Sequence, residues 1–339
     1  MIDQWARFFK RSPLQVNRTH EADAELLRID DTTLLAVTID SVVEEISAGV
    51  YEDPFTMGWV VVMSNFSDLA AVGAQPLGIV ISVCFDPAQE ESFRKRMAEG
   101  AAEACHRLGV CVLGGDMNAA EKTSLTGCAL GFVPKNQKMI RLGCQPGDIL
   151  FISGKAGSGN ALGMRKLSGL PEDCLPENSY RPVARIKECQ TIRKYATSCM
   201  DTSDGLFITL DQLFRLNRKG FIFQAEWSEF LDPAVLKFCQ QMKIPAWFMA
   251  GGIHGEFELV FTIPAQEVRS FLQDAESIGF FPIRLGRVQE ELALTLSLAS
   301  MERINIDMAP LRNLWTSSDR SLKKILQEYH AWGKRWGLE

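Results

Sequence analysis

The alternation of hydrophobic and polar residues along this chain predicts two successive α/β units. In the first unit, alternating apolar positions predict a β-hairpin that ends at Asp40. Asp53 and Pro54 form a good N-cap and N1 pair, and a helical pattern runs from them to Gly73. Strands are expected at QPLGIVISVCF, GVCVLGGD and LTGCALGFVP, the second of them apolar enough to predict burial. An amphipathic helix is expected at PAQEESFRKRMAEGAAEACHRLG.

A polar, turn-rich stretch, KNQKMIRLGCQPGD, marks the boundary between the two units. Beyond it, DILFISG predicts a strand, and a helix begins at about Asn160. Later strands are expected at GFIFQAEW, FELVFTIP, PIRLGRVQ and LALTLSL, with a helix at QEVRSFLQDAESIG. The expected organisation is therefore two α/β domains, residues 1–142 and 143–300, followed by a helical tail with three tryptophans, residues 301–339.

Composition and charge narrow the classes of function. The chain has 339 residues, of which 46% are hydrophobic, enough for two domains with real cores. Its net charge of −6 gives no basic footprint, so no nucleic-acid partner is expected. No apolar run is long enough for a membrane span, and the start has no signal-peptide pattern, so we expect a cytoplasmic enzyme. Nine scattered cysteines without a C-x-x-C pair give little support to a zinc site.

The segment GSGNALG, residues 157–163, is similar to a dinucleotide-binding fingerprint because it follows a strand and opens a helix. Its glycine spacing is one residue too long, and no acidic residue ends a strand about 20 residues later. We therefore reject a nicotinamide or flavin site there.

Aspartates recur at the ends of the predicted elements. Asp40 closes a strand, Asp116 follows two glycines after a strand, and Asp201 and Asp204 lie in DTSDG, where the chain enters a helix. Asp68 lies near a helix C-terminus, whose partial negative charge disfavours a carboxylate unless a cation offsets it. Each of these aspartates alone has an ordinary explanation as a cap or turn residue. Together they suit a hard cation such as Mg²⁺ bridging to phosphate oxygens.

Several segments resemble thiamine-monophosphate kinases of the PurM-like (AIR synthase-related) superfamily. They are NFSDLAAVGAQP, GGD, RLGCQPGDILFISG, MDTSDGL and GG…FELVFTIP, and the similarity covers roughly residues 2–290 in order. The resemblance implies a two-domain PurM-like α/β (α+β) architecture. It has an N-terminal AIR synthase-like domain that pairs in a homodimer and a C-terminal AIR synthase-like domain. ATP and Mg²⁺ are expected between them, near the dimer interface.

The resemblance also implies site residues by position. The expected metal ligands are Asp23, Thr38, Asp40, Asp68, Asp116, Asp201 and Asp204, of which Asp68 and Asp204 are the expected catalytic residues. The expected ATP contacts are Arg141, Ser203 and the backbone at Gly114 and Gly115. Lys155, which this chain adds after a strand, is expected to be either a phosphate contact or a solvated loop lysine.

The acceptor side departs from the family pattern. Ser47 stands where the family has a histidine that helps to hold thiamine phosphate. GGIHGEFEL is two residues longer than the family's GGEDYEL, so Glu256 or His254 is expected to replace its substrate-contacting glutamate. The ordinary alternative for His254 is a surface-loop histidine. The chain thus keeps the residues for ATP and Mg²⁺ and changes those that would touch thiamine phosphate.

Three hypotheses follow. The favoured one is an ATP- and Mg²⁺-dependent kinase that phosphorylates a small acceptor, either thiamine phosphate or a different metabolite. The second keeps the fold and has ATP activate a carbonyl or amide oxygen for attack by a nucleophile. The third is a non-catalytic binding subunit, which six retained aspartates argue against because clustered carboxylates without a cation repel one another.

Overall fold

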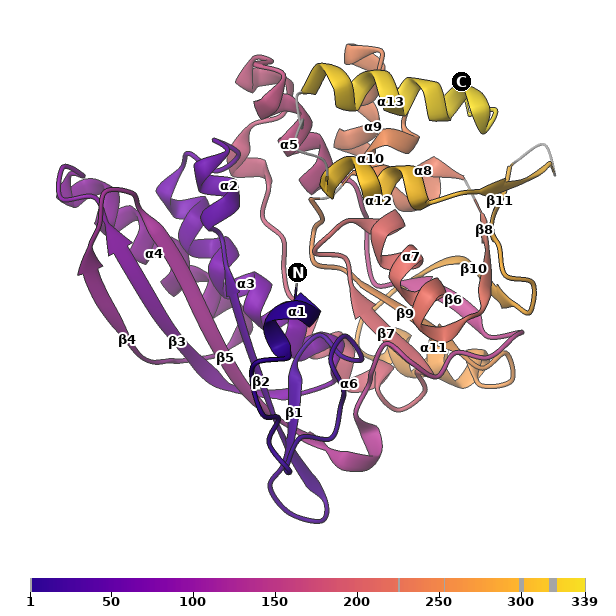
Figure 1. The fold of residues 1–339 in the computed structure, drawn as a ribbon, viewed down its shortest axis with the longest axis horizontal. Coiled ribbons are helices and arrows are strands. Elements are labelled where there is room, and N and C mark those ends of the chain that lie inside the picture. Colours follow the sequence, from indigo (N-terminus) through magenta and orange to yellow (C-terminus); the bar gives the residue numbers. More distant parts are fainter. Residues whose placement is uncertain (1, 225, 253, 299–301, 317–321, 339) are drawn as a thin grey trace.

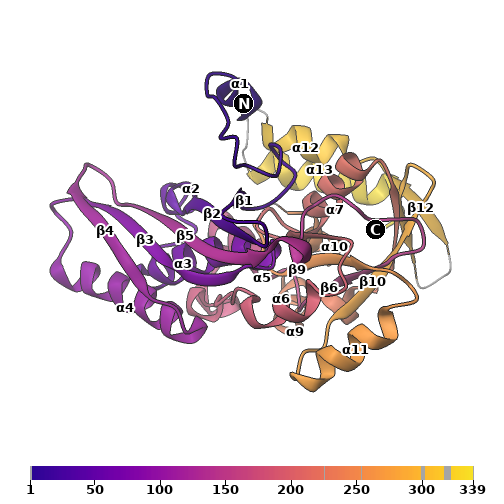
Figure 2. The ribbon, with the colours of Figure 1, turned by 90° about the horizontal axis from the view of Figure 1, so that it is seen from below.

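The computed structural model describes residues 2–224, 226–252, 254–298, 302–316 and 322–338. It has two β-sheets with helices around them, and Figure 1 shows the chain passing from the first sheet to the second once. The first unit lies at one end of the molecule and the second at the other (Figure 2). This confirms the predicted mixed α/β fold class.

The first sheet has five strands in the order β1-β2-β5-β3-β4. β1 and β2 pair antiparallel, which confirms the predicted hairpin. The strands are β1 (Glu25–Arg28), β2 (Thr33–Ser41), β3 (Gln75–Phe85), β4 (Val112–Ala119) and β5 (Ser124–Pro134). The helices of this unit are α1 (Ile2–Ala6), α2 (Val43–Ser47), α3 (Pro54–Ala71) and α4 (Glu91–Leu108).

Helix α3 packs against β2 and β5 and is the centre of the first unit. Asp53 caps it by accepting a hydrogen bond of 3.2 Å from the backbone N–H of Phe55, as the Asp-Pro pair predicts. At the crossing with α4, a Cβ on Gly58 would lie 2.0 Å from the carbonyl oxygen of Met97, so only glycine permits this close approach. Beyond Phe55, Asp68 is the one residue of α3 that is not fully buried, because it faces the candidate site.

The prediction that GVCVLGGD is buried is wrong. All eight residues of β4 are exposed, because β4 is an edge strand that pairs only with β3 in the described part of the chain. The apolar side chains of this strand therefore face solvent in a single copy of the chain.

The second sheet has seven strands in the order β12-β11-β8-β10-β6-β9-β7. They are β6 (Ile149–Ile152), β7 (Ser198–Asp201), β8 (Gly220–Gln224), β9 (Leu259–Ile263), β10 (Ile283–Gln289), β11 (Leu294–Ser297) and β12 (Arg303–Ile306). The sequence pattern did not predict β12, which begins the segment expected to be a helical tail. Arg303–Ile306 pairs with β11 and so belongs to this sheet.

The helices of the second unit cover its sheet. They are α5 (Ser158–Leu167), α6 (Ile186–Ile192), α7 (Leu206–Asn217), α8 (Trp227–Phe230), α9 (Pro233–Met242), α10 (Trp247–Gly251), α11 (Val268–Ser277), α12 (Ala309–Thr316) and α13 (Leu322–Arg335). Short 3₁₀ turns occur at Lys135–Gln137, Glu172–Cys174 and Glu177–Ser179. The predicted tail is helical in α12 and α13, and residues 301, 317–321 and 339 of it lie outside the described residues.

Helix α13 packs on α10 through aromatic side chains. The ring of Trp247 lies 5.4 Å from that of Tyr329 and 5.5 Å from that of Trp336. The hydroxyl of Tyr329 donates a hydrogen bond of 2.8 Å to the carbonyl oxygen of Gly251. In the described residues, no helix is both long and apolar enough to cross a membrane.

Candidate active site

Three aspartates from distant segments lie together where the two units meet. Asp23 precedes β1, Asp68 lies in the last turn of α3, and Asp201 ends β7. One carboxylate oxygen of each lies within 4.8 Å of those of the other two. We call these residues the aspartate cluster. A loop, a helix end and a strand end from both units therefore converge on one point.

Hydroxyl groups orient the carboxylates of the cluster. Thr38 on β2 donates a short hydrogen bond to Oδ2 of Asp68. Ser67 on α3 donates to Oδ2 of Asp201 at 2.6 Å, and Ser203 donates to Oδ1 of the same residue at 2.9 Å. Because these donors satisfy one side of each carboxylate, its remaining lone pairs are available to a ligand.

The cluster is electrostatically unfavourable without a cation. Burial, followed by repulsion from Asp201 and Asp23, raises the pKa of Asp68 well above its ordinary value. Burial and the charge of Asp23 raise the pKa of Asp201 to about 7. A bound cation would offset the repulsion among these carboxylates and so favour the ionised forms of Asp68 and Asp201.

Arg141 supplies a positive charge beside the cluster. Its Nη2 donates to Oδ1 of Asp23 at 3.0 Å and its Nε donates to Oδ2 at 3.2 Å, so the pair is bidentate. Its Nη1 donates to Oε1 of Gln212 at 3.3 Å. The guanidinium is thereby fixed at the edge of the cluster, as expected for a residue that contacts a phosphate.

Asp40 and Asp204 lie near the cluster without joining its closest group. The backbone N–H of Asp40 donates to Oδ1 of Asn65 at 3.1 Å, which fixes the end of β2 against α3. Burial raises the pKa of Asp40. Desolvation also raises the pKa of Asp204, although Arg141 opposes this, and Asp40 and Asp23 raise it further. These mutual effects place both carboxylates in the electrostatic field of the cluster.

The donor set fits Mg²⁺. The three aspartates of the cluster offer carboxylate oxygens, and Mg²⁺ prefers oxygen ligands. Burial and the neighbouring aspartates raise the pKa of both Asp68 and Asp201, so a cation at the cluster would favour their ionised forms. The residues present therefore fit one or more Mg²⁺ ions better than they fit an empty structural core.

Asp116, which the sequence predicts as a metal ligand, lies away from the aspartate cluster in the structure. It is on the exposed edge strand β4 with Gly114 and Gly115, and its carboxylate accepts a hydrogen bond of 2.6 Å from Asn118. It lines a hollow of about 280 Å³ on the sheet face opposite α3, together with Ile39 and other residues of β2, β3 and β5. Within one copy of the chain, Asp116 is not part of the aspartate cluster.

Lys155 also points to other partners. Its Nζ donates to the backbone carbonyl oxygens of Glu229, at 2.6 Å, and Ser228, at 3.4 Å, in helix α8. In the structure this lysine therefore bonds to backbone carbonyl groups of α8 and not to the aspartate cluster.

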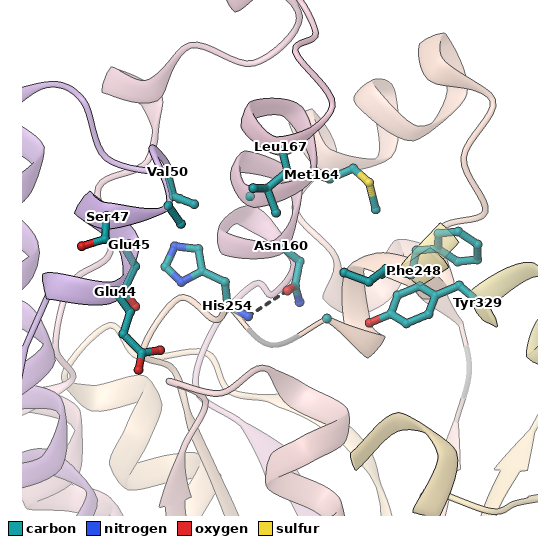
Figure 3. A pocket seen from close by; sticks show the side chains of 14 residues that line it. Glu44, Glu45, Ser47, Val50, Asn160, Met164, Leu167, Phe248, His254 and Tyr329 are labelled. Carbon is teal, nitrogen blue, oxygen red and sulfur yellow. Dashed lines mark hydrogen bonds between the residues drawn. The ribbon is translucent and has the colours of Figure 1, made fainter. Parts of the chain in front are cut away.

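A second feature adjoins the cluster: a cavity of about 540 Å³ that we call the α2–α13 chamber (Figure 3). Its walls come from α2, α5, α10, α13 and the loop after α10. It is lined by Glu44, Glu45, Ser47, Ala48, Val50, Asn160, Gly163, Met164, Leu167, Phe248, Gly252, His254, Ile325 and Tyr329. In Figure 3 the two glutamates lie at one side and the rings of Phe248 and Tyr329 at the other, with His254 between them.

Of the three residues expected to contact the acceptor, two line this chamber and one does not. Ser47 and His254 line it. Glu256 is buried beside it and caps α5, because its Oε2 accepts a hydrogen bond of 2.7 Å from the backbone N–H of Gly157. Its other oxygen accepts from the hydroxyl of Thr202 at 3.2 Å, and burial raises its pKa to about 8. Glu256 therefore does not line the chamber but joins the start of α5 to the segment after β7.

His254 is not the surface-loop histidine of the ordinary alternative. Its ring packs against those of Tyr51, at 5.5 Å, and Tyr180, at 5.4 Å, which also stack on each other. Its Nε2 is 2.9 Å from the hydroxyl of Tyr51, and its backbone N–H donates to Oδ1 of Asn160 at 2.9 Å. Burial lowers its pKa to about 4, so the ring is neutral near pH 7.

The sequence did not single out Tyr51, Tyr180 or Asn160, and no motif marks them. Their roles depend on segments that are far apart in the chain, such as Tyr180 donating to the carbonyl oxygen of Gly255 at 2.6 Å.

The loop that carries His254 is also joined to the loop that carries Asp201 and Asp204. The backbone N–H of Gly255 donates to the carbonyl oxygen of Ser203 at 3.0 Å. A Cβ on Gly255 would lie 1.5 Å from the carbonyl oxygen of Thr202, so the two loops can meet this closely only with glycine there. A wall of the chamber is thus in direct contact with the segment that follows Asp201 of the cluster.

Residues 21–133 match the family model for the AIR synthase related protein, N-terminal domain. The thiamine-monophosphate kinase of Archaeoglobus fulgidus is 30% identical over 247 residues, covering 72% of this chain and 78% of that protein. This chain belongs to the thiamine-monophosphate kinase family. The Escherichia coli K12 member is 28% identical over 269 residues, covering 76% of this chain and 81% of its own length. The structure of AaThiL complexed with AMPPCP and TMP has a TM-score of 0.70 at 24% identity and covers 87% and 91% of the two chains, so the fold is shared.

Membership of the thiamine-monophosphate kinase family confirms the resemblance and the predicted class of enzyme, an ATP-dependent kinase. It also confirms the PurM-like fold. The domain boundaries at residues 142 and 300 and the role of each site residue stay predictions.

Proposed function

We propose that this kinase uses Mg²⁺ and transfers the γ-phosphoryl group of ATP to a small acceptor held in the α2–α13 chamber. The observation that carries the proposal is that Glu44 and Glu45, which line the chamber, interact electrostatically with Asp204 beside the aspartate cluster. The loops that bear Asp201 and His254 are joined by the Gly255–Ser203 hydrogen bond. A nucleotide phosphate at the cluster and an acceptor in the chamber would therefore meet.

The proposal assigns one role to the three residues of the aspartate cluster and separate roles to two residues beside it. Asp23, Asp68 and Asp201 hold Mg²⁺, which when bound neutralises charge on the phosphate oxygens. Arg141, fixed by Asp23, contacts a phosphate. Asp204 lies at the open edge of the cluster, where it orients the acceptor group and completes the metal site. The protein thus acts mainly by positioning the reactants and by offsetting charge.

This chain differs from the family pattern in the residues that are expected to contact the acceptor. The relatives are named thiamine-monophosphate kinases, so thiamine phosphate is the first acceptor to test. Ser47 in place of the family histidine and the neutral, tyrosine-bound His254 change the surface that such an acceptor would meet. We therefore propose a small-molecule acceptor whose non-reacting part is held differently from thiamine phosphate.

The exposed sheet face supports a homodimer. The side chains of Ile39 and Val80 are 71% and 37% exposed on β2 and β3 and line the hollow on this face, an unusual cost for one copy in water. Asp116 lies on the same face. In a homodimer that covers this face, Asp116, Gly114 and Gly115 would lie at an interface, where the family resemblance expects ATP and Mg²⁺. A cytoplasmic location stays a prediction.

The proposal is tested by following ³²P from [γ-³²P]ATP in the presence of Mg²⁺ and thiamine phosphate. Label on thiamine diphosphate establishes the kinase with the family acceptor. Asp68→Asn should abolish any transfer, whereas Asp274→Asn, which changes an acid paired with Lys194 in the second unit, should not. Label released as orthophosphate only when a second substrate is added would favour carbonyl activation instead. ATP binding without either product, across a metabolite panel, would favour the non-catalytic subunit.

A further inference from the structure

Three aromatic rings from distant segments pack against one another beside the chamber, and we call them the three-ring cluster. They belong to Tyr51, between α2 and α3, to Tyr180, before α6, and to His254, in the loop after α10. The ring centroids of the two tyrosines are 6.1 Å apart, and that of His254 lies 5.5 Å from Tyr51 and 5.4 Å from Tyr180. The two tyrosines are 1% and 2% exposed. The cluster therefore joins the first unit to two segments of the second.

Tyr51 anchors helix α2 at its C-terminal end. The helix has five residues, all of them described and none of them buried, and no side chain caps its N-terminus, so it has little stability of its own. The backbone N–H groups of Val50 and Tyr51 donate to the carbonyl oxygen of Glu45, at 2.9 Å and 3.4 Å, which ties Tyr51 to the helix. Because Glu44 and Ser47 of α2 line the chamber together with Glu45, a contact that fixes the ring of Tyr51 also fixes this wall.

His254 fixes the ring of Tyr51 by a hydrogen bond. Its Nε2 is 2.9 Å from the hydroxyl of Tyr51, and Figure 3 shows the imidazole turned toward the segment of Glu45 and Val50. Burial lowers the pKa of His254 to about 4, so the ring is neutral near pH 7 and no charge is buried beside the tyrosine. The bond thus holds the two side chains together without the cost of a desolvated charge.

The loop of His254 also contacts the turn that carries Asp204. The backbone N–H of Gly255 donates to the carbonyl oxygen of Ser203, the residue before Asp204, at 3.0 Å. The carbonyl oxygen of Gly255 accepts a hydrogen bond of 2.6 Å from the hydroxyl of Tyr180, so the third ring holds the same peptide segment. The three-ring cluster is therefore linked to the carboxylates of the candidate site through one backbone hydrogen bond.

We propose that His254 is a positioning residue of the kinase, which acts through Tyr51 to hold α2 in a fixed place relative to the turn that carries Asp204. This inference rests on the proposed function, because it takes that turn as part of the nucleotide site and α2 as a wall of the acceptor chamber. Glu44 and Glu45 of α2 interact electrostatically with Asp204, so a shift of α2 changes the field at this carboxylate. His254 lies in GGIHGEFEL, which is two residues longer than the family pattern, so that pattern does not predict this contact.

Four variants separate the hydrogen bond from the packing of the rings. Tyr51→Phe removes only the hydroxyl, and His254→Phe keeps a ring but has no nitrogen to bond with Tyr51. His254→Gln gives up the ring and keeps a hydrogen-bonding group close to the position of Nε2, so it should rescue the positioning role. Tyr195→Phe removes a hydroxyl that donates to Asp274 on α11 at 3.0 Å, and it is the matched control.

Hydrogen–deuterium exchange in the presence of the ATP analogue AMPPCP and Mg²⁺ tests whether the bond couples α2 to the nucleotide site. The analogue should slow exchange in residues 201–206 of every variant, because the aspartates of the site are unchanged. In residues 43–52 it should slow exchange at least tenfold in the wild-type protein, His254→Gln and Tyr195→Phe, because the hydrogen bond passes the ordering of the turn to α2. In Tyr51→Phe and His254→Phe the slowing of residues 43–52 should be less than twofold.

Turnover of [γ-³²P]ATP with thiamine phosphate and Mg²⁺ gives a kinetic readout. Tyr51→Phe and His254→Phe should lower kcat at least tenfold at an unchanged KM for ATP, whereas His254→Gln should retain at least half of kcat. A purely structural role would lower the urea concentration at half-unfolding without this division between kcat and KM. A wild-type protein that binds AMPPCP but does not phosphorylate thiamine phosphate would exclude that acceptor, and the exchange measurement then decides the inference.

Binding of AMPPCP with Mg²⁺ is measured for every variant by calorimetry, which separates this inference from the proposed function. Intact binding with equal slowing of residues 43–52 in the wild-type protein and in both phenylalanine variants overturns the role of His254 and leaves the proposed function standing. Failure of the wild-type protein to bind AMPPCP with Mg²⁺ overturns the proposed function, and this inference with it.

Discussion

The hydroxyl of Ser67 donates a hydrogen bond of 2.6 Å to Oδ2 of Asp201, although 134 residues separate them in the chain. Ser67 belongs to α3 in the first unit, and Asp201 ends β7 in the second. Both residues are buried. The bond therefore joins the two units at the aspartate cluster and fixes one carboxylate of the cluster.

Ser67→Ala should weaken the binding of Mg²⁺. Loss of one hydrogen bond to a charged group costs about 1.5 kcal/mol, which corresponds to about a tenfold higher Mg²⁺ concentration for half-maximal activity. The measurement is the Mg²⁺ dependence of the rate of ATP turnover. Ser277→Ala, which removes a hydroxyl bonded to the carbonyl oxygen of Asp274 in α11, is the control and should change nothing. An unchanged Mg²⁺ dependence in Ser67→Ala would show that this contact does not orient a ligand.

Ser47→His should improve the use of thiamine phosphate. Ser47 lines the chamber at the position of the family's phosphate-holding histidine, and its side chain is exposed enough to accept a larger replacement. One added hydrogen bond to a charged phosphate is expected to raise kcat/KM for thiamine phosphate about tenfold. Steady-state kinetics with Ser47→Ala as the control check this. A fall in kcat/KM would mean that the chamber holds its acceptor in a different orientation.

Glu256→Gln should change the pH dependence of stability. Burial raises the pKa of Glu256 from 4.5 to about 8, so between these values the folded protein retains a proton that the unfolded chain releases. Its contribution to stability is present below pH 4.5 and is lost as the pH rises to about 8, so the free energy of unfolding falls across this window. The difference is of the order of 5 kcal/mol.

Urea unfolding of both proteins from pH 5 to pH 9 measures this effect. The wild-type protein should lose stability with rising pH relative to Glu256→Gln, and the two curves should separate progressively. Parallel curves would show that Glu256 is ionised in the folded protein at neutral pH.

Ile39→Glu should dissociate the proposed homodimer. A two-fold interface places the substitution on both copies, and unpaired like charges at an interface cost several kcal/mol, so the dimer dissociation constant should rise at least 100-fold. Sedimentation velocity over a range of concentrations measures it. Leu272→Glu, an exposed apolar position on α11, is the matched control. A wild-type protein that sediments as a monomer would contradict the dimer, and with it the role of the β4 face.

Much of the fold and the cluster follows from local sequence signals. Asp53-Pro54 correctly starts α3, and the strand QPLGIVISVCF has the predicted ends. The unfavourable placement of Asp68 at a helix C-terminus predicted a cation site, and the structure brings this residue together with Asp23 and Asp201. Asp232-Pro233 gives an equally clear signal for α9, where Asp232 accepts a hydrogen bond of 2.7 Å from the backbone N–H of Ala234.

Other features depend on contacts that no local pattern reports. The apolar run before Asp116 predicted burial, but hydrophobicity does not distinguish burial within one chain from burial by a partner. Lys155 bonds to α8 and His254 packs against two tyrosines, and both environments arise only when distant segments pack. The chamber wall formed by α13 likewise arises only when α13 packs against the distant helix α10.

The most direct test of Mg²⁺-dependent nucleotide binding at the aspartate cluster is a calorimetric titration with AMPPCP, a non-hydrolysable ATP analogue. The wild-type protein should bind it with Mg²⁺ and at least 100-fold more weakly with EDTA, because the carboxylates of Asp68 and Asp201 repel an uncompensated phosphate. Asp68→Asn should lose the Mg²⁺-dependent affinity. Equal affinity with and without Mg²⁺, or an unchanged affinity in Asp68→Asn, would contradict the assignment of the cluster as the metal and phosphate site.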